Sequence, residues 1–151
     1  MRRFVVVTLL LLVTVTACFA VQKSSRAKAE DDIRDAVFRY QIHHYKADVY
    51  FLAISDRDPS SSFMTRFKGC KPPVKKQSES KLDPGRGIKD RRTGARGVVL
   101  HSEAVKWLNK NTVEVTGDYF QNMRAGSGWI FRVALKNGRW VVTEAKCKAI
   151  Y

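Results

Sequence analysis

The chain has few of the side chains that hold metals or form redox centres: three cysteines and three histidines among 151 residues. The histidines, His43, His44 and His101, form no recognised ligand spacing, and no Cys-x-x-Cys pair occurs. The sequence therefore predicts neither a metal site nor a cofactor. No other motif in the chain specifies a reaction.

Acidic residues are scarce as well. The chain has 14 Asp and Glu against 28 Lys and Arg, which gives a net charge of +14 and an isoelectric point near 10.1. Such a charge favours an anionic partner, and lipid headgroups, cell-envelope polymer, nucleic acid and acidic protein all qualify. Charge alone does not choose among them.

The apolar segment at the N-terminus is too short for a comfortable membrane span, which needs about 20 residues. Phe4 to Val15 follow the positively charged Met1-Arg2-Arg3, and this arrangement is typical of a secretory signal. We therefore assign residues 1–20 to a signal peptide and expect the mature protein to be periplasmic or extracellular.

The end of this segment, Val15-Thr16-Ala17-Cys18, resembles a bacterial lipobox, in which the cysteine is lipid-modified and becomes the first mature residue. If Cys18 is lipidated, the protein is anchored to the cell envelope. Cleavage by ordinary signal peptidase near Ala17 or Ala20 and an uncleaved anchor are the alternatives.

Residues 21–29 are mostly small, polar or basic, and we interpret them as a linker to a single domain over residues 30–151. Acidic residues from Glu30 onward are typical of a helix N-terminus. Apolar residues then recur at helical spacing, and the stripe contains Ile33, Val37, Phe38, Tyr40, Ile42, His44 and Tyr45. A helix this amphipathic needs a sheet to pack on.

The last fifty residues alternate apolar and polar side chains, which predicts consecutive antiparallel strands. Asn137-Gly138 predicts a tight hairpin turn, because both residues tolerate positive φ. The strand over residues 98–108 changes parity, which predicts a bulge near Ser102. Earlier in the chain, we expect a strand over residues 48–54 and a short helix over residues 60–68. Together these elements predict an α+β fold, with the N-terminal helix packed on a curved antiparallel sheet.

Several segments resemble exported bacterial proteins of the nuclear transport factor two-like, or cystatin-like, superfamily. The segments are residues 31–40, 58–69, 71–75, 113–119, 125–128 and 136–142. The resemblance implies a cone of curved sheet wrapped on a helix, often with a pocket at its open end. The superfamily includes isomerases, cyclases, dehydratases and binding modules, so the fold does not settle activity.

The cone that this resemblance implies gives a set of candidate pocket residues: Tyr40, His44, Trp107, Tyr119 and Trp129. His44 and Tyr119 are the candidates for acid–base catalysis, although a histidine on such a stripe is more often part of the wall. Asp118 and Glu114 lie on the strand face opposite Tyr119, which argues against a Tyr–Asp pair.

Residues 71–96 form a basic segment with few apolar groups, which predicts a long surface loop or wide hairpin. It could form an anion-binding patch or be a solvated loop. Because it lacks interleaved aromatics, it does not favour nucleic acid. The candidate anion-binding residues are Lys75, Lys76, Arg86, Lys89, Arg91, Arg92 and Arg96.

Cys70 and Cys147 form an even pair if Cys18 is lipidated or removed, and an oxidising compartment permits a disulfide. Two free thiols are the alternative.

Two functions agree with these observations. The first is a non-catalytic exported or membrane-tethered module that binds an anionic or small apolar partner. The second is a small enzyme of the cyclase or isomerase type. A pocket with converging polar groups would favour the enzyme, whereas a cone filled by aromatic side chains would favour the module.

Overall fold

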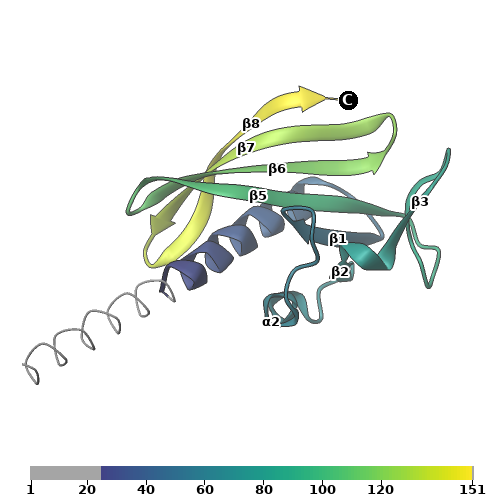
Figure 1. Cartoon of the computed structure of the whole chain (residues 1–151), viewed down its shortest axis with the longest axis horizontal. Coiled ribbons are helices and arrows are strands. Elements are labelled where there is room, and N and C mark those ends of the chain that lie inside the picture. The colour runs from purple at the N-terminus through teal and green to yellow at the C-terminus, as the bar shows by residue number, and fades with distance from the viewer. Residues whose placement is uncertain (1–24, 151) are drawn as a thin grey trace, which may run out of the picture. The chain divides into compact units, whose positions relative to one another are not determined.

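The computed structural model describes residues 25–150. The chain divides between Asp31 and Asp32 into two compact units, and the second contains all of the strands (Figure 1). The predicted signal peptide and the predicted lipidation site, Cys18, lie outside the described residues. None of the described helices is long and apolar enough to cross a membrane.

The first described element is a helix over residues 25–44, here called the long helix. It includes residues 25–29, which the sequence assigned to a linker. From Asp32 onward it packs on the sheet through four fully buried side chains, Ile33, Val37, Phe38 and Gln41. Their spacing places them on one side of the helix. Tyr40 and His44, expected in the same stripe, lie at its exposed margin.

The sheet has six strands in the order β2-β1-β5-β6-β7-β8. Strand β1 (Val49–Ile54) is parallel to both β2 (Val74–Lys76) and β5 (Gly97–Asn109). The remaining pairs are antiparallel and form a meander of β5, β6 (Thr112–Asn122), β7 (Ala125–Lys136) and β8 (Arg139–Ile150). The predicted α+β fold is confirmed, with a mixed sheet that is mostly antiparallel.

The predicted turn at Asn137-Gly138 is confirmed. Both residues have positive φ, 50° and 75°, as a type I′ turn requires. Lys136 and Arg139 pair across the turn, which sets the register of β7 and β8.

The predicted bulge in β5 is also confirmed. Ser102 pairs with Gly117 and Val105 pairs with Val115, so Glu103 and Ala104 together oppose one residue of β6. The extra residue keeps the apolar side chains before and after it on one face of the sheet. Without it, the second half of β5 would turn its apolar residues to the other face.

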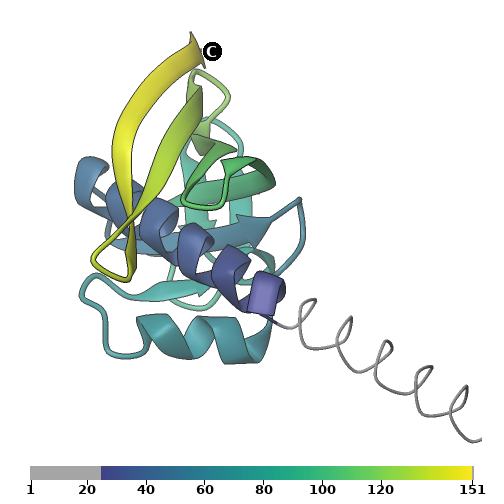
Figure 2. The same ribbon diagram turned by 90° about the vertical axis from the view of Figure 1, so that its left-hand side faces the viewer.

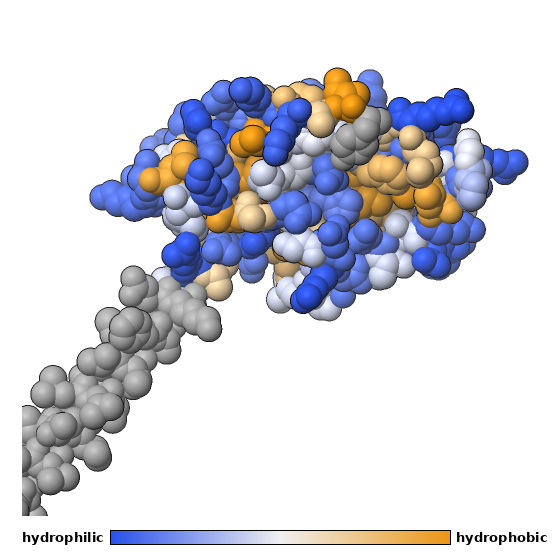
Figure 3. Space-filling view, turned by 45° about the horizontal axis from the view of Figure 1, so that its top comes forward, coloured by the Kyte–Doolittle hydropathy of each residue, from blue (hydrophilic) through white to orange (hydrophobic). Residues whose placement is uncertain are grey.

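The strongly bent sheet curls over the long helix (Figure 2). Two apolar clusters lie on this helix-covered face. One is centred on Phe38, Leu52 and Leu100, and the other on Val37, Val115 and Phe131. Full burial of each such side chain contributes about 1.5 to 3 kcal/mol. On the face of the molecule seen in Figure 3, hydrophilic residues surround patches of apolar residues.

The predicted short helix is formed by α2 (Ser61–Met64) and η1 (Thr65–Phe67). The Ser60 side chain caps it by accepting a hydrogen bond from the Phe63 N–H, at 3.1 Å. Phe63 and Phe67 are buried and pack edge to face on Phe38. This short helix therefore covers the same face of the sheet as the long helix.

The basic segment is more ordered than its composition predicts. It contains β2, η2 (Gln77–Glu79) and an antiparallel hairpin of β3 (Ser80–Asp83) and β4 (Gly87–Asp90). The hairpin lies on the face of the sheet opposite the long helix. There Ile88 packs in a third apolar cluster that includes Phe51 and Val99.

One buried carboxylate holds the basic segment together. The Lys75 ammonium lies 2.5 Å from Asp90 Oδ2, and the backbone N–H groups of Arg92 and Thr93 donate to Oδ1. Burial disfavours the charged form, but these hydrogen bonds outweigh it and lower the pKa of Asp90 to about 2.

Substitution Asp90→Asn is expected to destabilise the protein by about 1 to 3 kcal/mol at pH 7, because it leaves Lys75 without its buried partner. Since the folded-state pKa is depressed, the stabilisation is present above pH 4 and is lost as pH falls towards 2. Urea unfolding at several pH values measures this difference. Glu79→Gln, which changes the exposed carboxylate 3.8 Å from the same lysine, serves as the control. An equal loss in both variants would contradict the role of Asp90.

The hypothesis of a disulfide between Cys70 and Cys147 is wrong: both are free thiols in the structure. Cys70 packs beside the cluster around Phe38, next to η1 and shortly before edge strand β2. Cys147 lies on β8, the opposite edge strand, where it pairs with Trp129. The order of the strands separates the two cysteines.

Candidate functional site

Three of the predicted pocket residues, Tyr40, His44 and Trp129, form a chain of ring contacts, whereas the other two contact different aromatic rings. The Tyr40 ring stacks on His44 at 5.9 Å, and His44 meets Trp129 edge to face at 6.0 Å. Tyr119 stacks on Tyr45 at 4.0 Å. Trp107 packs edge to face on Trp140 at 5.6 Å, in the cluster centred on Val37, Val115 and Phe131. The aromatic residues expected to line a pocket thus pack against other rings.

The two weak catalytic candidates have different surroundings. His44 is exposed at the end of the long helix. The Tyr119 hydroxyl donates to Gln121 Oε1 at 2.6 Å, and burial, with a smaller effect of Tyr45, raises the pKa of Tyr119. A raised pKa keeps this phenol protonated at neutral pH, which makes it a poor general base.

A pocket of about 460 Å³ collects three of the predicted anion-binding residues, and we call it the basic pocket. Arg86 comes from the β3–β4 turn, Lys89 from β4, and Arg96 from the segment before β5. Asn122, at the end of β6, adds an amide, and the remaining lining residues are Gly85 and Gly94. Lys89 and Arg96 are partners in an isolated β-bridge, which fixes the two cations side by side.

The charges of the basic pocket are only partly compensated. Lys89 lies 2.8 Å from Asp83, and its hydrogen bond lowers the pKa of that carboxyl. Within residues 25–150, neither Arg86 nor Arg96 forms an ion pair. Two guanidinium groups are therefore available to an external anion.

The other predicted cations lie elsewhere. Lys75 is paired with the buried Asp90, and Lys76 donates to Ser61 Oγ at 3.3 Å. Arg91 lines a groove beside the β3–β4 hairpin, and Arg92 is exposed. The structure thus brings together Arg86, Lys89 and Arg96 and separates the remaining four.

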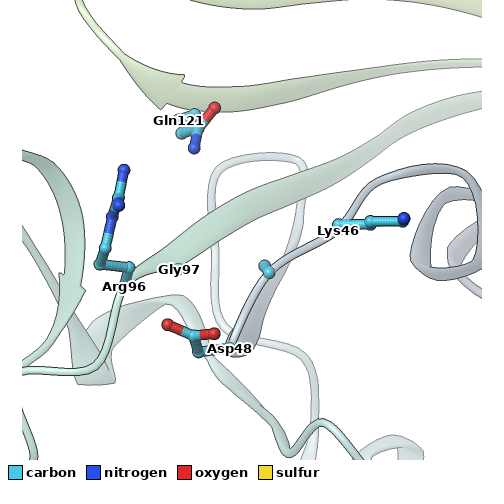
Figure 4. Close-up of a pocket in the computed structure, with 6 residues that line it drawn as sticks. Lys46, Asp48, Arg96, Gly97 and Gln121 are labelled. Atoms are coloured by element: carbon cyan, nitrogen blue, oxygen red, sulfur yellow. The ribbon is translucent and has the colours of Figure 1, made fainter.

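A second hollow, of about 340 Å³, shares Arg96 with the basic pocket (Figure 4). Arg96, Gln121 and Asp48 border one space, whereas Lys46 points away from it. Gly97 lies at its base, and a Cβ there would come within 2.6 Å of the Phe51 ring. A residue without a side chain therefore lets β5 pass close to β1 beside Arg96.

A third feature lies on the hairpin-covered face of the sheet. His101 of β5 and Asp118 of β6 are direct neighbours in the register, and His101 Nδ1 is hydrogen-bonded to Asp118 Oδ1. The backbone carbonyl of Asp118 accepts a bond from Gln41 Nε2 at 3.1 Å. Asp118 is therefore anchored to the long helix as well as to His101.

Three carboxylates surround His101. Burial lowers its pKa, but the hydrogen bond and charge of Asp118, with the charges of Asp56 and Glu103, outweigh burial and raise it. Burial, together with the charges of Asp56 and Asp118, raises the pKa of Glu103. His101 is thus favoured in its protonated form.

Sequence reasoning missed the His101–Asp118 pair. Both residues were on strands predicted to be neighbours, and Asp118 was correctly placed on the face opposite Tyr119. Two register irregularities, one between Ser102 and Val105 and one between Trp107 and Asn109, lie between the turn and His101. The sequence predicted only the first, so counting back from the turn did not align the two side chains.

Among the described residues, no group of three or more His, Cys, Asp or Glu side chains could hold a metal ion. No family model, no curated protein and no solved structure matches the chain significantly.

The titration of His101 tests its surroundings. We expect a pKa above the ordinary 6.5, and Asp118→Asn should lower it, because the hydrogen bond and the charge of Asp118 are then lost. Stability contributed by the pair is present at low pH and is lost as pH rises through the folded-state pKa. Imidazole NMR signals measure the change. Glu114→Gln, on the same strand, is the control, and a pKa below 6.5 in the unsubstituted protein would contradict the assignment.

Proposed function

We propose that this protein is a non-catalytic binding module that holds an anionic group, of the phosphate or carboxylate type, in the basic pocket. The observation that carries the proposal is the convergence of Arg86, Lys89 and Arg96 on one pocket, with two of the three cations free of ion pairs within the described residues. A guanidinium binds phosphate and carboxylate through two parallel hydrogen bonds. The Asn122 amide adds a neutral donor beside them.

The filled helix–sheet interface also supports a module over an enzyme. Tyr40, His44 and Trp129 contact one another or neighbouring rings, so the region expected to hold a catalytic pocket is occupied by aromatic packing. The alternative, a cyclase or isomerase that uses His44 or Tyr119, is less well supported, because His44 is exposed and the Tyr119 hydroxyl is bonded to Gln121.

The chemistry of the pocket fits two sources of anions, lipid headgroups and soluble envelope polymers. An adjoining groove favours the lipid surface, because it shares Gly85 and Asn122 with the basic pocket and is lined by Leu82 and Met123. These two side chains are 45% and 77% exposed. Apolar side chains beside cations are typical of surfaces that dock on anionic membranes.

We also propose that the protein is exported by a signal peptide at residues 1–20. Lipidation of Cys18 is one way in which the exported protein could be attached to the cell envelope. The proposal also includes membership of the nuclear transport factor two-like superfamily. The long helix under a strongly bent antiparallel meander supports the superfamily proposal. Near anionic headgroups, each cation of the basic pocket would contribute about 1 kcal/mol.

Replacing both unpaired cations tests this function. We expect the double variant Arg86→Gln, Arg96→Gln to bind phosphatidylglycerol-containing vesicles roughly thirtyfold more weakly, because two cations contribute about 2 kcal/mol. Vesicle sedimentation and titration with soluble polyphosphate measure the two sources separately. The control is Lys136→Gln, Arg139→Gln, which removes the same charge at the exposed β7–β8 turn.

An equal loss in both double variants would contradict the proposal, since attraction would then follow net charge and not the pocket. Binding to vesicles alone identifies headgroups as the source of the anion, whereas equal binding of polyphosphate identifies a soluble polymer. Failure of both probes to bind the unsubstituted protein would also overturn the proposal.

A further inference from the structure

A groove of about 560 Å³ lies between the hairpin-covered face of the sheet, the β3–β4 hairpin and the β1–α2 loop. Its apolar side is formed by Leu82, Ile88, Val99 and Phe120. Its polar side includes His101, Asp56 and Asp58. Apolar surface beside a few convergent polar groups is the usual character of a small-molecule site.

The groove differs from the rest of the protein in its charge. Two carboxylates, Asp56 and Asp58, and two cations, Lys81 and Arg91, line it. The charge of a protonated His101 is compensated by the paired Asp118. In a chain with a net charge of +14, this lining is close to neutral. A site without net charge favours an uncharged ligand, because a charged one would lose hydration without a matching partner.

The two carboxylates have different environments. Asp58 accepts bonds from the Ser78 N–H at 2.9 Å and the Ser78 hydroxyl at 2.6 Å, so it fixes the loop to η2. Asp56 lies in a tight turn with φ of 59° and its side chain is 87% exposed. Asp56 is therefore the carboxylate free to meet a ligand.

His101 presents a buried polar atom beside this carboxylate. Its side chain is only 12% exposed, and its Nδ1 is held by Asp118. Its Nε2 is buried and has no hydrogen-bond partner among the described residues, and Asp56 Oδ1 lies 3.9 Å away. That separation is too long for a direct hydrogen bond. A buried donor without an acceptor is costly, so this geometry fits a ligand atom placed next to both groups.

We propose that the groove binds a neutral polyhydroxylated ligand of the sugar class, with one hydroxyl between His101 and Asp56. A hydroxyl accepts a bond from Nε2–H and at the same time donates one to the carboxylate. The C–H face of a sugar ring then lies on the apolar side of the groove, against Ile88 and Phe120. The groove has room for one or two sugar rings, because small-ligand pockets range from about 300 to 1,000 Å³. This binding is independent of the basic pocket.

The experiment uses the purified full-length chain and three uncharged probes: glucose, N-acetylglucosamine and cellobiose. We expect saturable changes in the amide NMR signals of His101, Phe120 and Ile88 with at least one probe. Asp56→Asn should weaken that binding about tenfold, because it replaces a charged acceptor. Asparagine tolerates the positive φ at this turn, so the fold is kept. Glu144→Gln, an exposed carboxylate on β8, is the matched control and should bind like the unsubstituted protein.

Binding should also fall as pH rises through the folded-state pKa of His101, since the Nε2–H donor is then lost. The groups that face the imidazole are Asp118 on β6, Asp56 in the turn and Glu103 on β5. The Arg86→Gln, Arg96→Gln variant should bind the sugar normally, so a failed basic pocket and a failed groove are distinguishable.

Three results would overturn the proposal. The first is the absence of saturable shifts with every probe, which would mean that only water bridges His101 and Asp56. The second is equal affinity of Asp56→Asn and Glu144→Gln for the sugar. The third is shifts that map to the helix-covered face instead of the groove.

Discussion

One extra residue in β5 keeps the apolar side chains of both halves of this strand on the helix-covered face of the sheet. It allows Leu100 and Val105 to contact the helix-covered clusters although an even alternation would send them to opposite faces. The same bulge leaves His101 on the other face, directly opposite Asp118. Bulges are common where a sheet must bend and re-aim a side chain. Here one inserted residue sets both the packing of the core and the position of the polar pair.

The cations of the protein fall into two groups with different physical roles. Lys75 is paired with the buried Asp90, and this ion pair orders a segment too polar to fold by apolar burial alone. Arg86 and Arg96 are unpaired within the described residues and lie around one pocket. The ordering by Lys75 positions the hairpin that carries Arg86 and Lys89. Binding through Arg86 and Lys89 therefore depends on the ion pair between Lys75 and Asp90.

Much of the fold followed from the sequence because its signals were local. The Asn137-Gly138 turn, the short helix after Pro59 and the parity change near Ser102 each predict one element, and each is present. The parallel pairing of β1 with β5 and β2 depends on contacts between distant segments. Sequence periodicity contains no signal for such pairing. The predicted disulfide was wrong for the same reason, since the strand order places the two cysteines at opposite edges of the sheet.

The site could be predicted only in part, because the pairing of His101 with Asp118 depends on the register of β5 and β6. Cross-strand proton NOEs measure this register directly. We expect contacts between His101 and Asp118 and between Val105 and Val115, which requires two residues of β5 opposite one of β6. Contacts between Val105 and Glu114, the register without a bulge, would contradict it.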